Sequence, residues 1–276
     1  MPKSCTTSEV SLTPVPPLSL EHVKDEHLGA AQLKLVVAQV QHERLMAASD
    51  AKEALAVGSR LDEGLAGPNP IPAQGVFFQI GAVAGPVEPA PQINLTAWQY
   101  VSEARDWVAT VAPDFFSLET LSYGSWTEFR TRFEKLLTAV GEVLGPQLVR
   151  RTGLRYVDEL KAPGITAAGD WAGRIMPAFL GPAHDPEIGK SVTTIQQAVE
   201  FQGSGGARVT LRHGTVTTPD NKPAYLLDHD CYTDRARPFE AARLLEEYDG
   251  LHRLAIGVFQ RAITSDFYKQ LKDGTV

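Results

Sequence analysis

The sequence predicts an α+β fold in which an antiparallel β-sheet carries long amphipathic helices on one face. Short apolar segments follow one another across turn signals such as Gly203-Ser-Gly-Gly206 and Pro219-Asp-Asn221, so consecutive strands should be antiparallel neighbours. Two strand-rich segments, at about 96–121 and 191–232, each lead into a long helical pattern. Strand–helix–strand alternation is not sustained, which argues against a doubly wound parallel sheet.

The chain is long enough for one large domain. Residues 1–25 are polar and contain three prolines, so we expect an extended N-terminal arm there. Residues 26–276 should then form a single α+β domain. Because the strand-and-helix scheme occurs twice, two related halves at 26–161 and 162–276 remain an open alternative, although no clear residue identity links them.

The elements of the first half follow from apolar patterns and caps. Leu33–Val40 predicts the first strand, and Ser49-Asp50 caps a helix that continues to Leu61. The Gly- and Pro-rich stretch 64–91 is expected to be irregular, with the apolar island Val76–Ile80 as a short strand or a plug against the core. Alternation predicts further strands at 97–103, 107–111 and 115–121.

Two long helices are expected because apolar residues recur three and four positions apart. The first runs from Trp126 to Leu144, is capped by Ser125 or Thr127, and is stopped by Gly145-Pro146. The second runs from about Pro238, a residue favoured in the first turn, to about Ile263. Between these helices the sequence predicts the following elements: strands at 148–157, 191–201, 207–216 and 224–232, and a short helix at 171–180.

Composition limits the class of protein. Of 276 residues, 43% are hydrophobic and 21% charged, which is ordinary for a globular domain. No segment approaches the ~20 apolar residues of a membrane span, and the N-terminus lacks a signal core, so we expect a cytoplasmic protein with no membrane contact. Only Cys5 and Cys231 occur and no Cys-x-x-Cys motif exists, which excludes a cysteine-based zinc site. No cofactor is expected.

The basic strand Leu148–Val157 supplies the candidate binding residues. A period of two places Arg151 and Arg155 on one face with Gly153 between them, while Arg150 and Tyr156 point the other way. The glycine leaves a gap in which a ligand can approach, and two guanidinium groups suit a carboxylate or a phosphate. The alternative is that both arginines form ion pairs with acids on neighbouring strands, such as Asp158, Glu159 or Glu119.

Local charge favours an anionic partner for this region. The whole chain has a formal charge of −7, which argues against coating nucleic acid by bulk electrostatics. Residues 130–161 nevertheless carry seven basic and four acidic side chains, a local balance of +3. That asymmetry fits an acidic protein surface, a nucleotide or a nucleic-acid backbone.

Two further groups of residues are candidates for catalysis. Asp228 and Asp230 share one face of a strand and could hold a divalent metal if a third acid joined them, or could pair with Arg208 and Arg212 instead. No metal site is therefore assigned.

His252 lies one helical turn from Tyr248 and Asp249, so a carboxylate-held general base is conceivable. No motif places a serine or cysteine nucleophile beside it, and a half-buried structural histidine is the alternative. Phosphate-binding, dinucleotide-binding and kinase signatures do not occur.

The chain resembles a sporadically distributed, uncharacterised family of bacterial proteins of similar length. The resemblance rests on these segments: Phe115–Tyr123, Trp126-x-x-Phe129, Arg151–Val157, Leu251-His252, Phe259 and Ile263-Thr264. The family has no established activity. Its patchy distribution is similar to that of mobile or defence-associated genes such as toxin–antitoxin pairs, which implies a partner-binding role by association only.

The sequence therefore predicts a non-enzymatic binding protein, of an immunity, antitoxin or regulatory kind, that binds an anionic partner through the basic strand. A protein partner is expected first, with nucleic acid or a nucleotide as the other choice. Two alternatives stay open: a metal-dependent enzyme acting on a phosphorylated or nucleic-acid substrate, and a self-assembling structural protein. Homo-oligomer formation is also left open.

Overall fold

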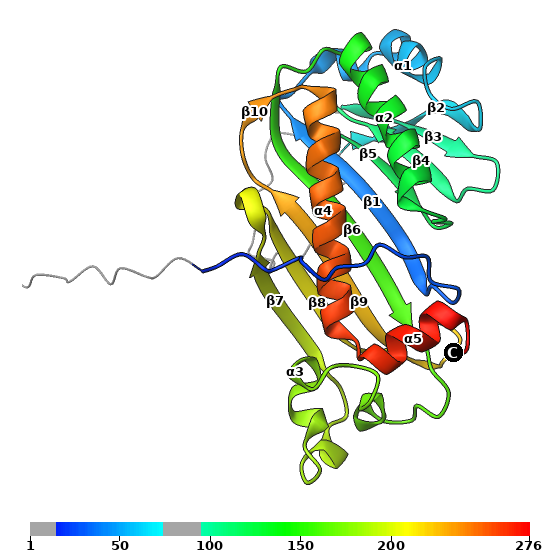
Figure 1. Ribbon diagram of the computed structural model, residues 1–276. Coiled ribbons are helices and arrows are strands. Elements are labelled where there is room, and N and C mark those ends of the chain that lie inside the picture. The colour runs from blue at the N-terminus through cyan, green and yellow to red at the C-terminus, as the bar shows by residue number, and fades with distance from the viewer. Residues whose placement is uncertain (1–14, 74–94) are drawn as a thin grey trace, which may run out of the picture.

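A computed structural model describes residues 15–73 and 95–276, and its centre is one antiparallel sheet (Figure 1). The strand order is β2-β3-β4-β5-β1-β6-β9-β8-β7, and the short β10 also pairs with β6. The strands are β1 Leu33–His42, β2 Leu65–Pro72, β3 Thr96–Ser102, β4 Trp107–Val111, β5 Phe115–Thr120, β6 Leu148–Leu160, β7 Gln196–Gln202, β8 Arg208–Thr217, β9 Pro223–Thr233 and β10 Arg237–Pro238. The predicted α+β class is confirmed.

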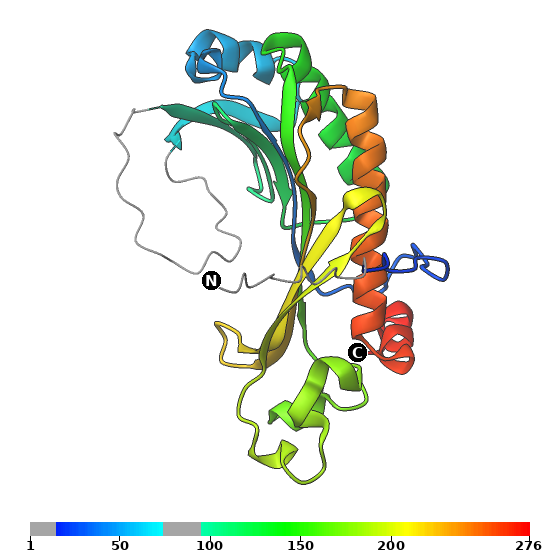
Figure 2. The same cartoon turned by 90° about the vertical axis from the view of Figure 1, so that its left-hand side faces the viewer.

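Helices accompany this sheet on one face. The α-helices are α1 Ala51–Gly58, α2 Trp126–Val143, α3 Pro177–Leu180, α4 Ala241–Ala262 and α5 Ser265–Asp273. Short 3-10 helices lie at Met46–Ser49, Ala168–Trp171, Gly181–His184, Gly189–Ser191 and Ser204–Gly206. The long α2 and α4 run across the same side of the sheet (Figures 1 and 2), and among the described residues no helix covers the opposite side. None of the helices in the described ranges has the length and apolar character needed to cross a bilayer.

The core lies between the sheet and these two helices because their apolar positions recur on one face. Phe129, Phe133 and Val140 of α2 are fully buried. The ring of Phe133 meets that of Tyr248 on α4 edge-on, with 4.6 Å between ring centres. α2 begins where predicted, because the Ser125 hydroxyl accepts a hydrogen bond from the Glu128 amide.

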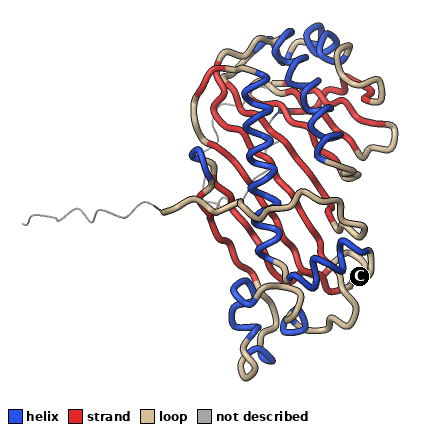
Figure 3. The backbone as a smooth tube through the Cα atoms, in the orientation of Figure 1, coloured by secondary structure: helices blue, strands red, loops and turns tan. Residues whose placement is uncertain are grey.

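The strand order repeats about the central β1–β6 pair. Figure 3 shows the strands side by side in one sheet. β1 lies between β5 and β6, and β6 lies between β1 and β9. β5 leads into α2, and β9 leads through β10 into α4. A division that follows this topology falls before β6, whereas the sequence placed the strand of residues 148–157 in the first half. The two-halves hypothesis itself stays a prediction.

Several expected elements differ in the structure. Residues 65–72 form the edge strand β2 although three prolines occur there, because an edge strand tolerates residues that cannot donate to a ladder. Pro238 pairs with Leu148 in β10, and α4 starts only at Ala241. The expected helix at 171–180 is two short turns instead, and β7 starts at Gln196. α5 was missed. Val76–Ile80 lies outside the described residues.

Residues 15–25, the described part of the expected arm, contain no helix or strand and cross α4 (Figure 1). The Leu18 amide donates to the Gln202 carbonyl, 2.7 Å away, and Gln260 of α4 exchanges hydrogen bonds with the backbone of Lys24. A Cβ at Gly257 of α4 would come within 2.6 Å of the Leu20 side chain, so this glycine permits the close crossing.

Candidate functional site

The predicted arginines of β6 lie on the face of the sheet opposite the helices, and acidic side chains hold both of them. Arg155 forms a two-pronged ion pair with Asp228, with N–O distances of 2.7 and 2.9 Å. Arg151 binds Asp230 at 3.2 Å and Asp234 at 3.1 Å. Ion pairing with acids on a neighbouring strand was the alternative that the sequence left open, but the acids come from β9 and the turn after it.

The register of β6 on β9 explains these partners. Arg155 lies opposite Asp230 and reaches diagonally to Asp228, and Arg151 reaches diagonally to Asp230. The expected gap at Gly153 is filled, because a Cβ there would come within 3.0 Å of the Arg151 guanidinium.

Asp228 and Asp230 are therefore the counter-ions of Arg155 and Arg151. Of the two arginines expected on β8, Arg212 lies 3.9 Å from Asp228, whereas Arg208 pairs with Asp234 at 2.9 Å. In the described ranges no cluster of three or more His, Cys, Asp or Glu side chains is placed to hold a metal ion. Arg150 is exposed to solvent.

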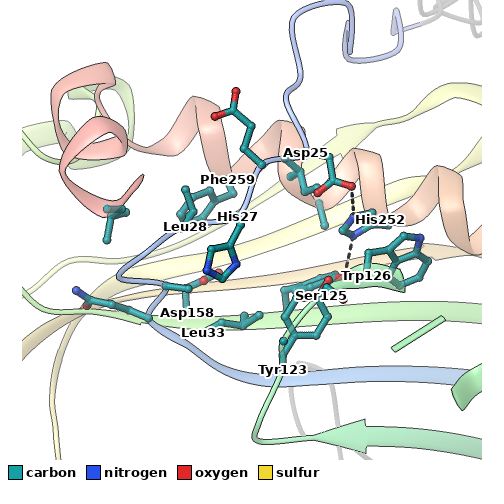
Figure 4. Close-up of a pocket in the computed structure, with 18 of the residues that line it drawn as sticks. Asp25, His27, Leu28, Leu33, Tyr123, Ser125, Trp126, Asp158, His252 and Phe259 are labelled. Carbon is teal, nitrogen blue, oxygen red and sulfur yellow. Dashed lines mark hydrogen bonds and ion pairs between the residues drawn. The ribbon is translucent and has the colours of Figure 1, made fainter. Parts of the chain in front are cut away.

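The remaining predicted residue, Tyr156, lines a pocket of about 340 Å³ on the helical face of the sheet. Tyr156 and Asp158 of β6 and His229 of β9 come from the sheet side, and α4 contributes His252 and Phe259. Residues 123–127 at the start of α2 form another wall, and residues 25–33, which lead from the end of the arm into β1, lie across the pocket (Figure 4). With Leu271 of α5, six segments of the chain thus line one cavity.

His252 is fixed from three directions in this pocket. Its Nδ1 is 2.8 Å from the Tyr156 hydroxyl, and its Nε2 is 3.2 Å from the Asp25 carboxylate of the arm (Figure 4). The Trp126 ring stacks on the imidazole with 4.3 Å between centres. Burial lowers the pKa of His252 below its usual value, so the ring is neutral at pH 7.

The expected Tyr248–Asp249–His252 cluster does not form, because the carboxylate and the hydroxyl turn to other elements. Asp249 faces α2, where it accepts hydrogen bonds from the Trp126 indole at 2.8 Å and from Arg130 at 2.9 Å. The Tyr248 hydroxyl donates to the carbonyl of Gln39 on β1.

Asp158 and His229 form the least satisfied polar pair of the pocket. The carboxylate of Asp158 lies 3.6 Å from Nδ1 of His229, which is too long for a hydrogen bond. Among the described residues neither ring nitrogen of His229 has a well-formed hydrogen bond. Burial raises the pKa of Asp158 to about 7 and lowers the pKa of His229 to about 4. Asp158 is therefore about half ionised at pH 7, and the neutral ring of His229 does not compensate its charge.

Several residues from the segments that resemble the bacterial family line this pocket, although they are far apart in the sequence. Those that line it are Tyr123, Trp126, Tyr156, His252 and Phe259. The sequence pattern predicted Trp126 as a core residue and His229 on the strand face opposite Asp228 and Asp230, but it gave no role to His229 and did not single out Asp25. Asp158 was proposed as a partner of the arginines, but it faces the helical side. Its position two residues after Tyr156 in β6 was the available signal.

The fold and the pocket define an α+β protein whose sheet-and-helix cavity lies beneath its own N-terminal arm. No protein-family model matches the chain, and comparison with curated proteins also finds no match. The resemblance described above stays a prediction, so the function is inferred from the chemistry of the pocket.

Proposed function

We propose that the protein is a non-enzymatic binding protein, of regulatory, immunity or antitoxin kind, that holds a small ligand in the pocket beneath the arm. The observation that carries this proposal is His229, which is 1% exposed and lines the cavity with both ring nitrogens lacking a well-formed hydrogen bond. Leaving a buried polar group unpaired costs about 1–3 kcal/mol, so such groups are rare without a role. A bound ligand would supply the missing partner.

The polar groups of the pocket favour binding over catalysis. Both nitrogens of His252 are engaged, by Tyr156 and by Asp25. The hydroxyl of Ser125, which lines the pocket, accepts the capping hydrogen bond of α2. The enzyme alternative drew on Asp228, Asp230 and His252, but the two aspartates and the histidine occupy opposite faces of the sheet.

The arm offers a route from ligand to partner. Asp25 binds His252, and the neighbouring Gly29 and Ala30 amides donate to the carbonyls of Lys272 and Leu271 on α5. The arm therefore forms part of the pocket wall and part of the outer surface at once. We place partner recognition here, because the arginines of the basic strand are already neutralised by aspartates and an anionic partner would have to displace them.

Filling the pocket is expected to remove a ligand that purifies with the protein. Ile256 of α4 lines the cavity, and Ile256→Trp would occupy it. Ile188→Trp, at a 58% exposed isoleucine outside the cavity, is the matched control. Native mass spectrometry of protein isolated from its host should detect a bound small molecule in the wild type and in Ile188→Trp, and none in Ile256→Trp. Equal ligand in both variants would count against the pocket.

A further inference from the structure

We infer that the ligand is a small organic cation, an amine carried on an apolar and preferably aromatic body, whose ammonium group lies between Asp158 and His229. This inference deepens the proposed function and rests on it. Three features of the pocket carry it: the sign of its charges, a buried carboxylate with no cationic partner, and its aromatic walls.

The charged side chains that line the pocket are all acidic. Of the described residues that line the pocket, Asp25, Glu26 and Asp158 are acidic and none is a lysine or an arginine. Outside the lining set, Lys272 pairs with Glu26. An anionic ligand would therefore meet carboxylates without a guanidinium or ammonium group to receive it, while a cation would meet attraction.

Asp158 has no lysine or arginine partner among the described residues. It is 8% exposed, and its one ion-pair contact there is with the neutral ring of His229 at 3.6 Å. Buried carboxylates in proteins are normally paired with a cation or held by several hydrogen bonds, because burying an uncompensated charge is costly. An ammonium group in the cavity would supply a counter-ion to Asp158. A second N–H of the ammonium group would donate to a ring nitrogen of His229, which has no well-formed hydrogen bond with any described residue.

The walls suit the rest of such a ligand. Tyr123, Trp126, Tyr156 and Phe259 line the same cavity as Asp158. Ring faces attract cations and also bury the apolar body of an amine. A volume of about 340 Å³ is at the lower end of the range for ligand sites, which favours a molecule with a single ring.

The test compares three molecules of matched shape and different charge: phenethylamine, phenethyl alcohol and hydrocinnamate. Isothermal titration calorimetry with the full chain at pH 8 gives each dissociation constant. The amine should bind at least about tenfold more tightly than the alcohol, since a charge-assisted hydrogen bond is worth roughly 1.5–3 kcal/mol. Hydrocinnamate should bind more weakly than the alcohol.

Three variants locate the effect. Asp158→Asn should abolish the preference for the amine while the alcohol still binds. Glu159→Gln, the next residue of β6 on the opposite face of the sheet, should leave the preference unchanged. Ile256→Trp should remove binding of the amine.

If the alcohol or the acid binds as tightly as the amine or more tightly, the inference that the ligand is a cation is wrong. The proposal that the pocket binds a ligand would be unaffected. A preference that persists in Asp158→Asn, or amine binding that persists in Ile256→Trp, would overturn the assignment to this carboxylate. If none of the three molecules binds, the inference that the ligand is a single-ring amine is wrong. The mass-spectrometric comparison of Ile256→Trp with Ile188→Trp then decides separately whether the pocket holds any ligand.

Discussion

Asp158→Asn is expected to raise the free energy of unfolding of the ligand-free protein by about 4 kcal/mol at pH 8, because the folded pKa of this carboxyl is about 7 and the ordinary value is 3.8. Burial is the cause of the difference. The folded state holds the proton more tightly than the unfolded state, so ionisation favours unfolding. Stability is lost as the pH rises from about 4 to about 7 and is then constant.

The variant removes this dependence, so its advantage over the wild type should shrink as the pH falls, to less than about half at pH 5. Other titratable side chains line the same cavity and are unchanged in the variant: Asp25, Glu26, His27, Tyr123, Tyr156, His229 and His252. The difference between the two proteins, measured by urea unfolding at several pH values, therefore isolates Asp158. An equal difference at pH 5 and pH 8, or a destabilised variant, would contradict the uncompensated carboxylate.

Asp228→Ala is expected to lower the free energy of unfolding by about 3–5 kcal/mol, which is the effect of breaking a largely buried ion pair from one side. The side chain of Asp228 is 6% exposed and that of Arg155 is 23% exposed, so the guanidinium would lose its main partner in a poorly hydrated position. Urea unfolding at pH 7 measures the effect.

The double variant Arg155→Met with Asp228→Leu is the control for this second prediction. Replacing both partners removes the unpaired charge, so its stability should lie much closer to that of the wild type than the stability of either single variant. Additive losses in the double variant would mean that the two side chains do not stabilise each other. The arginines would then be free for the binding role that the sequence predicted.

Local patterns predicted the elements well because each depends on neighbours in the sequence. The alternation in 148–157 predicted β6 and the shared face of Arg151 and Arg155. The Ser125 cap predicted the start of α2. The edge strand β2 was missed because its prolines argue against a strand unless its position in the sheet is known.

The site could not be predicted in the same way because its partners are distant. Asp25 reaches His252 across 227 residues, and the acids that neutralise Arg151 and Arg155 lie more than 70 residues away on β9 and beyond. A local count of basic residues therefore overstated the positive charge of the strand. Asp158 on an apolar face was the one local sign of a site.

The central claim, that the pocket beneath the arm holds a small ligand, is tested most directly by nuclear magnetic resonance. Small aromatic amines, alcohols and acids are titrated into isotopically labelled protein. The signals of the Trp126 indole and the His229 ring should shift in the wild type and in Ile188→Trp, and remain in place in Ile256→Trp. Shifts confined to the side chains of Arg151 and Arg155, or identical shifts in Ile256→Trp, would place binding elsewhere and contradict the claim.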